Sequence, residues 1–245
     1  MIAKLVVNID VDRARLSRSL QMIVGERSPF SGARQLAAVE RFIKAEFENY
    51  GLEVEGDSFL YSGETFHNLV ARLGTPGSGP VIILGAHFDS VIGTPGADDN
   101  ASGVAVLLET ARLLSRLNLA TQVLFCAFNL EELNMIGSAA FAQKLKAAGM
   151  KVAAMISLEM LGYTDSRPGS QKVPVGLSRF YPDRGDFIGV VGNWQSNELL
   201  HKFAAGMQQV STLRVETLSV PGKGALIPAV RLSDHAPFWD LGYPA

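Results

Sequence analysis

The amino-acid sequence predicts an α/β fold: a three-layer α/β/α sandwich around a mixed, mostly parallel central sheet. Apolar runs without alternation, such as residues 81–87 (VIILGAH), are typical of strands buried on both faces of a parallel sheet. Stretches with helical spacing of apolar residues follow these runs, so strands and helices alternate along the chain. Since 47% of the 245 residues are hydrophobic, the chain can bury a full core, and we expect one domain over residues 1–245.

The amino-terminal part of the chain is expected to form a helix and a hairpin. Residues 32–50 place Leu36, Val39 and Phe47 at helical spacing, and Gly51 follows directly. Two strands are expected over residues 52–63 and 65–74, with a turn near Gly63. The stretch TPGSGP then predicts a loop.

The central part of the chain repeats a strand followed by a helix. Strands are expected over residues 81–87, 121–129, 152–160 and 187–193. Helices are expected over residues 101–117, 138–149 and 197–210. The stretch between residues 162 and 187 is rich in Gly, Pro and Ser and predicts a long loop.

Composition disfavours several classes of protein. The net charge of −2 and the charged fraction of 19%, without a basic run between aromatics, disfavour nucleic-acid binding. Cys126 is the only cysteine, which excludes an internal disulfide framework. The opening apolar run is short and is broken by Asp10 and Asp12, so we expect no signal peptide, no membrane span and a cytoplasmic location.

Polar residues gather where the predicted central strands end. They are His87 and Asp89 after the first strand, Asp98, Asp99 and Asn100 before the long helix, Glu131 and Glu132 after the second strand, and Glu159 at the end of the third. Ligands of open α/β sheets bind beyond the carboxyl ends of the strands. We therefore expect these side chains to meet at one place.

Each of these residues taken alone has a simpler explanation. Asp98, Asp99 and Asn100 could serve only as a helix N-cap, because Asp and Asn favour that position. Glu131 and Glu132 could be the acidic first turn of the next helix. A single histidine at a strand end is more often solvated or hydrogen-bonded than a metal ligand. All of these explanations would have to coincide at one end of one sheet, which favours a shared site.

The residue types in this cluster suit a divalent metal. One imidazole and several carboxylates are ligands for zinc, and a carboxylate between two ions can bridge them. In an extended segment Glu131 and Glu132 would point to different sides, so that one binds metal while the other takes a proton. Asp89, two residues after His87, would fix the tautomer of the imidazole.

Four segments in this order resemble the M28 family of zinc aminopeptidases, whose relatives include glutaminyl cyclases. They are GAHFDSV, PGADDNASGVAVLLETARLL, FNLEELNMIGS and SLEMLGY. The late segment SDHAPFWDLGYPA, the helix at residues 32–50 and NLVARLG also fit the family. The resemblance implies a zinc-exopeptidase fold that hydrolyses a peptide or small amide substrate with a free amino terminus.

The resemblance also implies roles for individual residues. His87, Asp99, Glu132 and Glu159 would hold two zinc ions (Zn2+), with Asp99 as the bridge, although many members have Asp where this chain has Glu159. Glu131 would be the general base and later the proton donor. Asp89 would complete the catalytic set behind His87.

One departure from the family pattern concerns the last metal ligand. In the family this ligand is a histidine that follows the final core strand, and the sequence stops at Ala245 before such a segment. The resemblance therefore implies a domain without its usual final strand and last ligand segment, with an incomplete second zinc site. His235 and Asp234 are candidates for a substitute ligand or for neighbours of the ligands. An unpaired sheet edge would favour a homo-oligomer.

Two other functions remain open on the sequence. A cyclase of glutaminyl-cyclase type would use one zinc at Asp99, Glu132 and a late histidine, and the presence of His87 favours the two-metal peptidase over it. An inactive binding domain is the second alternative. The loop at residues 162–187 and the aromatic residues Tyr163, Phe180, Tyr181 and Trp194 are candidates to line a substrate pocket, and packing explains each of them equally well.

Overall fold

The computed structural model describes residues 10–75, 77, 79–173, 179 and 181–245. Its main sheet has five strands in the order β1-β2-β4-β3-β5. These strands are β1 (Glu53–Tyr61), β2 (Glu64–Leu73), β3 (Val81–His87), β4 (Val123–Phe128) and β5 (Val152–Ser157). The β1–β2 and β2–β4 pairs are antiparallel, whereas β3 runs parallel to both β4 and β5. The sheet is therefore mixed, as the sequence predicts.

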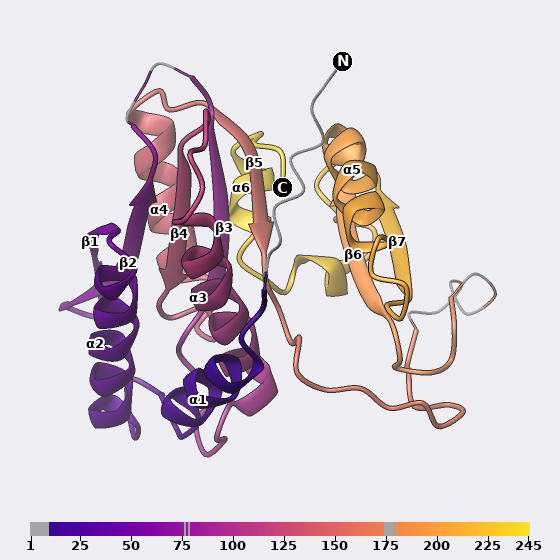
Figure 1. Cartoon of the computed structure of the whole chain (residues 1–245), viewed down its shortest axis with the longest axis horizontal. Coiled ribbons are helices and arrows are strands. Elements are labelled where there is room, and N and C mark those ends of the chain that lie inside the picture. The colour runs from indigo at the N-terminus through magenta and orange to yellow at the C-terminus, as the bar shows by residue number, and fades with distance from the viewer. Residues whose placement is uncertain (1–9, 76, 78, 174–178, 180) are drawn as a thin grey trace.

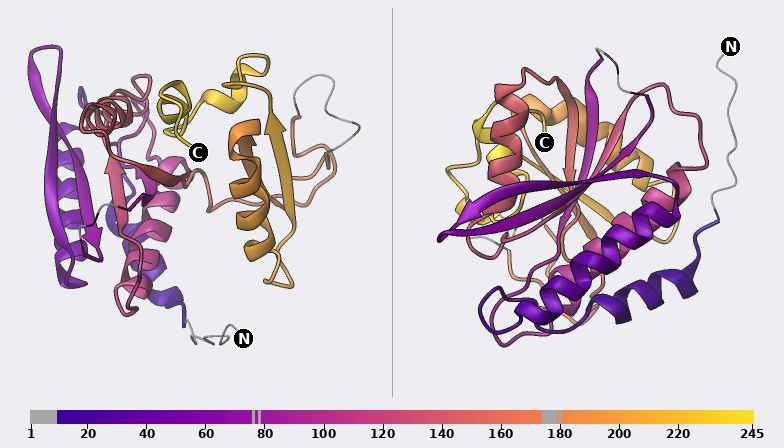
Figure 2. Two further views of the ribbon diagram at one scale, coloured as in Figure 1. Left: turned by 90° about the horizontal axis from the view of Figure 1, so that it is seen from above. Right: turned by 90° about the vertical axis from the view of Figure 1, so that its left-hand side faces the viewer.

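Helices cover both faces of this sheet (Figures 1 and 2). One face packs against α1 (Arg13–Ile23), α2 (Ala33–Asn49) and α3 (Gly103–Leu114), and the other against α4 (Ile136–Ala147) and α6 (Ala236–Asp240). Successive strand residues point to opposite faces. Accordingly, Leu69 and Ala71 of β2 join the first core while Val70 joins the second. The three-layer prediction is confirmed.

A second, two-stranded sheet lies beyond the β5 edge (Figure 1). It contains the parallel strands β6 (Ile188–Asn193) and β7 (Val215–Val220), with α5 (Asn197–Met207) packed on both. The sequence analysis did not anticipate this division into two sheets. On the side of β5 away from β3, the backbone N–H of Met155 donates to the carbonyl of Pro244 at 2.8 Å.

Most of the expected elements are present, with shorter bounds. The predicted third central strand ends at Ser157, so Glu159 lies in the loop that follows. The sequence analysis missed α1, β7 and α6, together with three short segments, Ala97–Ser102, Trp194–Ser196 and Pro228–Arg231. No helix in the described ranges has the length and apolar character needed to cross a membrane.

The aromatic residues expected at a substrate pocket are dispersed. Tyr163 and Trp194 are 70% and 67% exposed. Tyr181 donates its hydroxyl hydrogen to the carbonyl of Thr217, and Phe180 lies outside the described residues. Their predicted role as a common pocket lining is therefore not supported.

Candidate metal centre

His87 is the centre of the polar cluster predicted from the sequence. It is the last residue of β3 and is only 1% exposed. Its Nε2 atom lies 3.1 Å from Oδ1 of Asp99, 3.3 Å from Oε1 of Glu159 and 3.8 Å from Oε2 of Glu131. The ends of β3, β4 and β5 therefore deliver their side chains to one place, as expected for the carboxyl edge of such a sheet.

Two sets of donor atoms are close enough to hold a metal ion. One set contains His87, Glu131 and Glu132, and the other contains His87, Asp99 and Glu159, with the atoms of each set within 4.8 Å of one another. All four ligands implied by the resemblance thus belong to these sets. Which of them bind an ion, and whether one ion or two is held, remain predictions.

The carboxylate of Asp89 joins the end of β3 to the turn after β4. It is fully buried, and its Oδ1 lies 3.4 Å from Nδ1 of His87. The same oxygen accepts the backbone N–H of Glu131 at 3.0 Å, while Oδ2 accepts that of Glu132 at 3.1 Å. Asp89 is therefore placed to orient the imidazole and both glutamates together.

Glu131 and Glu132 lie in a turn, which corrects the extended segment assumed from the sequence. The turn begins beside Leu130, whose φ of 57° is in the left-handed region. Because the backbone bends here, the two carboxylates both reach the neighbourhood of His87 instead of pointing to opposite sides.

Asp99 differs from its two neighbours in what it contacts. Asp98 Oδ1 accepts the backbone N–H of Gly162 at 2.7 Å, and Asn100 Oδ1 accepts that of Gly103 at 3.1 Å. The capping explanation therefore describes Asn100 well, because Gly103 begins α3. It does not describe Asp99, whose carboxylate faces His87.

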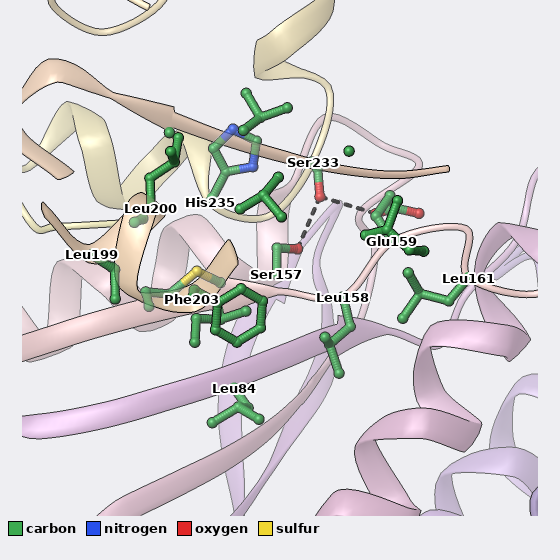
Figure 3. Close-up of a pocket in the computed structure, with 18 of the residues that line it drawn as sticks. Leu84, Ser157, Leu158, Glu159, Leu161, Leu199, Leu200, Phe203, Ser233 and His235 are labelled. Carbon is green, nitrogen blue, oxygen red and sulfur yellow. Dashed lines mark hydrogen bonds between the residues drawn. The ribbon is translucent and has the colours of Figure 1, made fainter. Parts of the chain in front are cut away.

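Glu159 is held by a chain of hydroxyl groups (Figure 3). Ser233 donates to Glu159 Oε2 at 3.0 Å, and the Oγ atoms of Ser233 and Ser157 are 2.9 Å apart. One oxygen of Glu159 thus faces His87 while the other is fixed by Ser233. The sequence analysis did not single out Ser233, and its only signal was its position directly before Asp234.

Asp234, the residue before His235, is a buried carboxylate. Asp234 is fully buried, and within the described part of the chain its carboxylate oxygens have no hydrogen-bond partner. Burial raises the pKa of Asp234 to about 7, and the neighbouring carboxylates of Glu159 and Asp89 act in the same direction.

The surroundings of His235 favour a neighbour of the candidate ligands over a substitute ligand. Its Nε2–H donates to the carbonyl of Val230 at 2.8 Å, and its ring packs edge-on against Trp239. Burial lowers the pKa of His235 to about 4, so the imidazole is neutral at pH 7. Neither of the two donor sets includes it. His235 instead lines an apolar cavity of about 530 Å³ between β5 and β6, with Leu200 and Phe203 of α5 (Figure 3).

The electrostatics of the cluster favour a bound cation. Burial raises the pKa of Glu131 to about 9 and that of Glu132 to about 7. Burial alone would lower the pKa of His87, but hydrogen bonds with Asp89, Asp99 and Glu159 raise it well above its usual value. The bond with His87 lowers the pKa of Asp99. Carboxylates crowded in this way repel one another, and a divalent cation among them would relieve that repulsion. The donor set therefore fits zinc or a similar ion.

Comparison with known proteins agrees with this fold. The chain is 41% identical over 215 residues to the uncharacterized protein YfbL of Escherichia coli, covering 83% of this chain and 65% of that protein. It is 32% identical over 161 residues to a probable zinc metalloprotease of Pyrenophora tritici-repentis, covering 56% of this chain and 37% of the relative. The solved structure of the Legionella pneumophila LapA aminopeptidase matches with a TM-score of 0.73 and 20% identity, covering 96% of this chain and 60% of that one. The chain thus spans less than two thirds of the length of each of these proteins.

The fold and the site together define an α/β domain with a candidate metal centre at the carboxyl edge of its sheet. The family model for peptidase family M28 matches residues 68–245, which include every residue of that centre. The chain belongs to peptidase family M28.

Proposed function

We propose that this protein is a metal-dependent peptidase, an aminopeptidase that uses zinc at the His87 centre and Glu131 as its general base. The observation that carries the proposal is the position of Glu131: a half-buried carboxylate within one of the two donor sets, whose backbone N–H donates to Asp89. Membership of family M28 and the relative named as a probable zinc metalloprotease support the same activity.

The residues fit a zinc ion in chemistry and spacing. His87, Asp99, Glu132 and Glu159 would hold it, in one site or in two. When bound, zinc supplies Lewis acidity, which polarises a carbonyl oxygen and makes water acidic enough to attack near neutral pH.

Glu131 would perform the proton transfers. Without a cation its pKa is raised to about 9 by burial, and a nearby positive charge lowers the pKa of a carboxyl group. Its carboxylate could then accept a proton from the attacking water and return it to the nitrogen of the leaving amine. Asp89 holds the backbone of this segment in place, so the base keeps its position during both transfers.

The substrate class follows from the charge of the site. Several carboxylates surround His87. The amino terminus of a peptide complements this negative charge when it is protonated, and it can bind the metal when it is neutral. We therefore propose peptides with a free amino terminus as substrates.

The test compares Glu131→Gln with the wild type after zinc loading. We expect the variant to keep its zinc content, because Gln preserves the shape of the side chain. Its kcat for release of leucine from a chromogenic leucine amide should fall by about 10²–10⁴-fold, the usual contribution of a general acid–base group. Glu40→Gln, which removes a half-buried carboxylate from α2, is the matched control and should leave kcat unchanged.

Two other results would contradict this function. Cyclisation of a peptide with amino-terminal Gln, without hydrolysis of the leucine amide, would indicate a cyclase. A folded, zinc-loaded wild type without activity on either substrate would indicate a binding domain.

A further inference from the structure

Arg27 is a fully buried cation, and within the described residues every hydrogen bond of its guanidinium goes to a backbone carbonyl. It lies between α1 and α2 and is 0% exposed. Its guanidinium donates to the carbonyl oxygens of Phe88 at 2.7 Å, Ile23 at 3.0 Å, Gly25 at 2.6 Å, Pro95 at 2.9 Å and Gly96 at 2.8 Å. A buried arginine is usually paired with a carboxylate. Here its rigid fork of donors joins separate stretches of backbone instead.

Three of these acceptors belong to the segments that carry the metal-centre residues. Phe88 stands between His87 and Asp89, and Pro95 and Gly96 lead into Asp99. The backbone N–H of Arg27 also donates to Oγ of Ser90 at 2.9 Å. Arg27 therefore connects the end of β3 to the loop that presents Asp99.

Gly96 leaves no free space between Arg27 and the backbone of Asp99. A β-carbon on Gly96 would lie 2.5 Å from Nη2 of Arg27 and 2.6 Å from the carbonyl oxygen of Asp99. The φ of Gly96 is 54°, a left-handed conformation that glycine adopts without strain. A shift of the guanidinium would consequently be passed to Asp99.

Arg27 keeps its positive charge in this buried position. Burial lowers its pKa to about 10, while Asp89 and Asp99 raise it, so Arg27 remains charged at neutral pH.

We propose that Arg27 is a positioning residue of the metal centre, which holds the loop of Asp99 against the end of β3 in the geometry that binds zinc. The inference rests on the zinc site of the proposed function. It differs from a purely structural role, in which Arg27 would stabilise the fold and leave metal affinity unchanged.

The first test is the zinc affinity of Arg27→Lys, measured on metal-free protein by competition with a chromogenic chelator. The single ammonium group of lysine cannot donate to all five carbonyls that the guanidinium binds. We therefore expect zinc binding to weaken by about 10–100-fold, the range typical for groups that orient metal ligands. Arg112→Lys is the matched control. Arg112 is also buried, but it pairs with Glu109 on α3. This control should lower the melting temperature and change zinc affinity by less than about twofold.

The second test is a double-mutant cycle with Asp99→Asn. If Arg27 acts through Asp99, Arg27→Lys should have little further effect on zinc affinity once Asp99 is changed. Combined with Glu159→Gln, on a loop that Arg27 does not contact, its effect should remain in full. If Arg27→Lys does not fold, Gly96→Ala replaces it. The added β-carbon would clash with Nη2 of Arg27 and should weaken zinc binding in the same way.

The outcomes separate the two proposals. Wild-type zinc affinity in both Arg27→Lys and Gly96→Ala would overturn the role of Arg27 while leaving the peptidase proposal intact. If Arg112→Lys also lost zinc affinity in proportion to its loss of thermal stability, the role of Arg27 would be overturned too. A wild type that does not bind zinc would overturn both.

Discussion

The hydroxyl group of Ser233 fixes the orientation of the Glu159 carboxylate. Because Ser233 fixes Oε2 of Glu159, only Oε1 faces His87. We predict that Ser233→Ala weakens zinc binding by about tenfold, since a free carboxylate must be ordered when the ion binds. Chelator competition on metal-free protein measures this change. Ser115→Ala, which removes a hydroxyl bonded to Arg112 on α3, serves as the control and should bind zinc like the wild type.

An unchanged zinc affinity in Ser233→Ala would show that Glu159 needs no such support. Restoration of affinity in Ser233→Thr, which keeps the hydroxyl, would strengthen the interpretation, because the substitution returns the hydrogen bond and adds only one methyl group.

The clustered carboxylates, His87 and the support from Asp89 were predictable from the sequence, whereas the supports from Ser233 and Arg27 were not. Each candidate metal-centre residue follows or precedes an apolar run, and that pattern can be read from the sequence alone. These residues are His87, Asp99, Glu131, Glu132 and Glu159. Ser233 bonds to a residue 74 positions earlier. Arg27 bonds to carbonyl groups, which every residue carries, so no side-chain pattern reveals its partners.

Among the elements, β5 and β6 have edges that face the same apolar cavity. Within the described residues, β5 pairs with β3 on one side and β6 pairs with β7. Met155 of β5 donates to Pro244 on the side away from β3, so β6 offers the more open edge beside apolar surface, an arrangement that favours association. We predict that the mean mass of the purified chain, measured by light scattering during gel filtration, rises with protein concentration.

A charged substitution on the β6 edge tests this source of association. Val191 of β6 is 39% exposed and lines the cavity, and Val191→Lys should shift the chain toward the monomer. Val210→Lys, on an exposed residue after α5, should not. A chain that remains monomeric at every concentration would contradict the prediction.

Two of the elements missed by the sequence analysis, α1 and β7, have weak apolar patterns. In α1 only Ser19 and Ile23 are buried, and the helix is capped by Asp12, whose side chain accepts the backbone N–H of Arg15 at 3.0 Å. Five of the six residues of β7 are half-buried, so its sequence shows no clear alternation. Tertiary contacts, with α3 and with β6 respectively, determine these two elements.

For the whole molecule, the clustered ionisable groups should make stability depend on pH. The folded state raises the pKa of Glu131 to about 9 and that of Glu132 to about 7, both from 4.5. It thus favours their protonated forms, and this stabilisation is complete below about pH 4.5 and is lost as the pH rises to about 9. The raised pKa of His87 acts in the same direction above its ordinary value of 6.5.

We therefore predict that the melting temperature of the metal-free protein falls between pH 5 and 9, and that Glu131→Gln reduces this fall. Zinc should remove most of the dependence, because the ion replaces the protons. Zinc binding at pH 7 should consequently release protons, which calorimetry in buffers of different ionisation enthalpy would detect. Equal slopes in the wild type and Glu131→Gln would contradict this assignment.

Asp89 links residues of the candidate metal centre that are distant in the sequence. One buried carboxylate contacts the imidazole of His87, at the end of β3, and the backbone of Glu131 and Glu132, in the turn after β4. A substitution at this position would disturb three members of the centre in a single event. The hydrophobic cores on the two faces of the sheet do not include Asp89. We expect a chain that lost Asp89 to keep both hydrophobic cores and to weaken the proposed zinc ligand His87 and the proposed base Glu131 together.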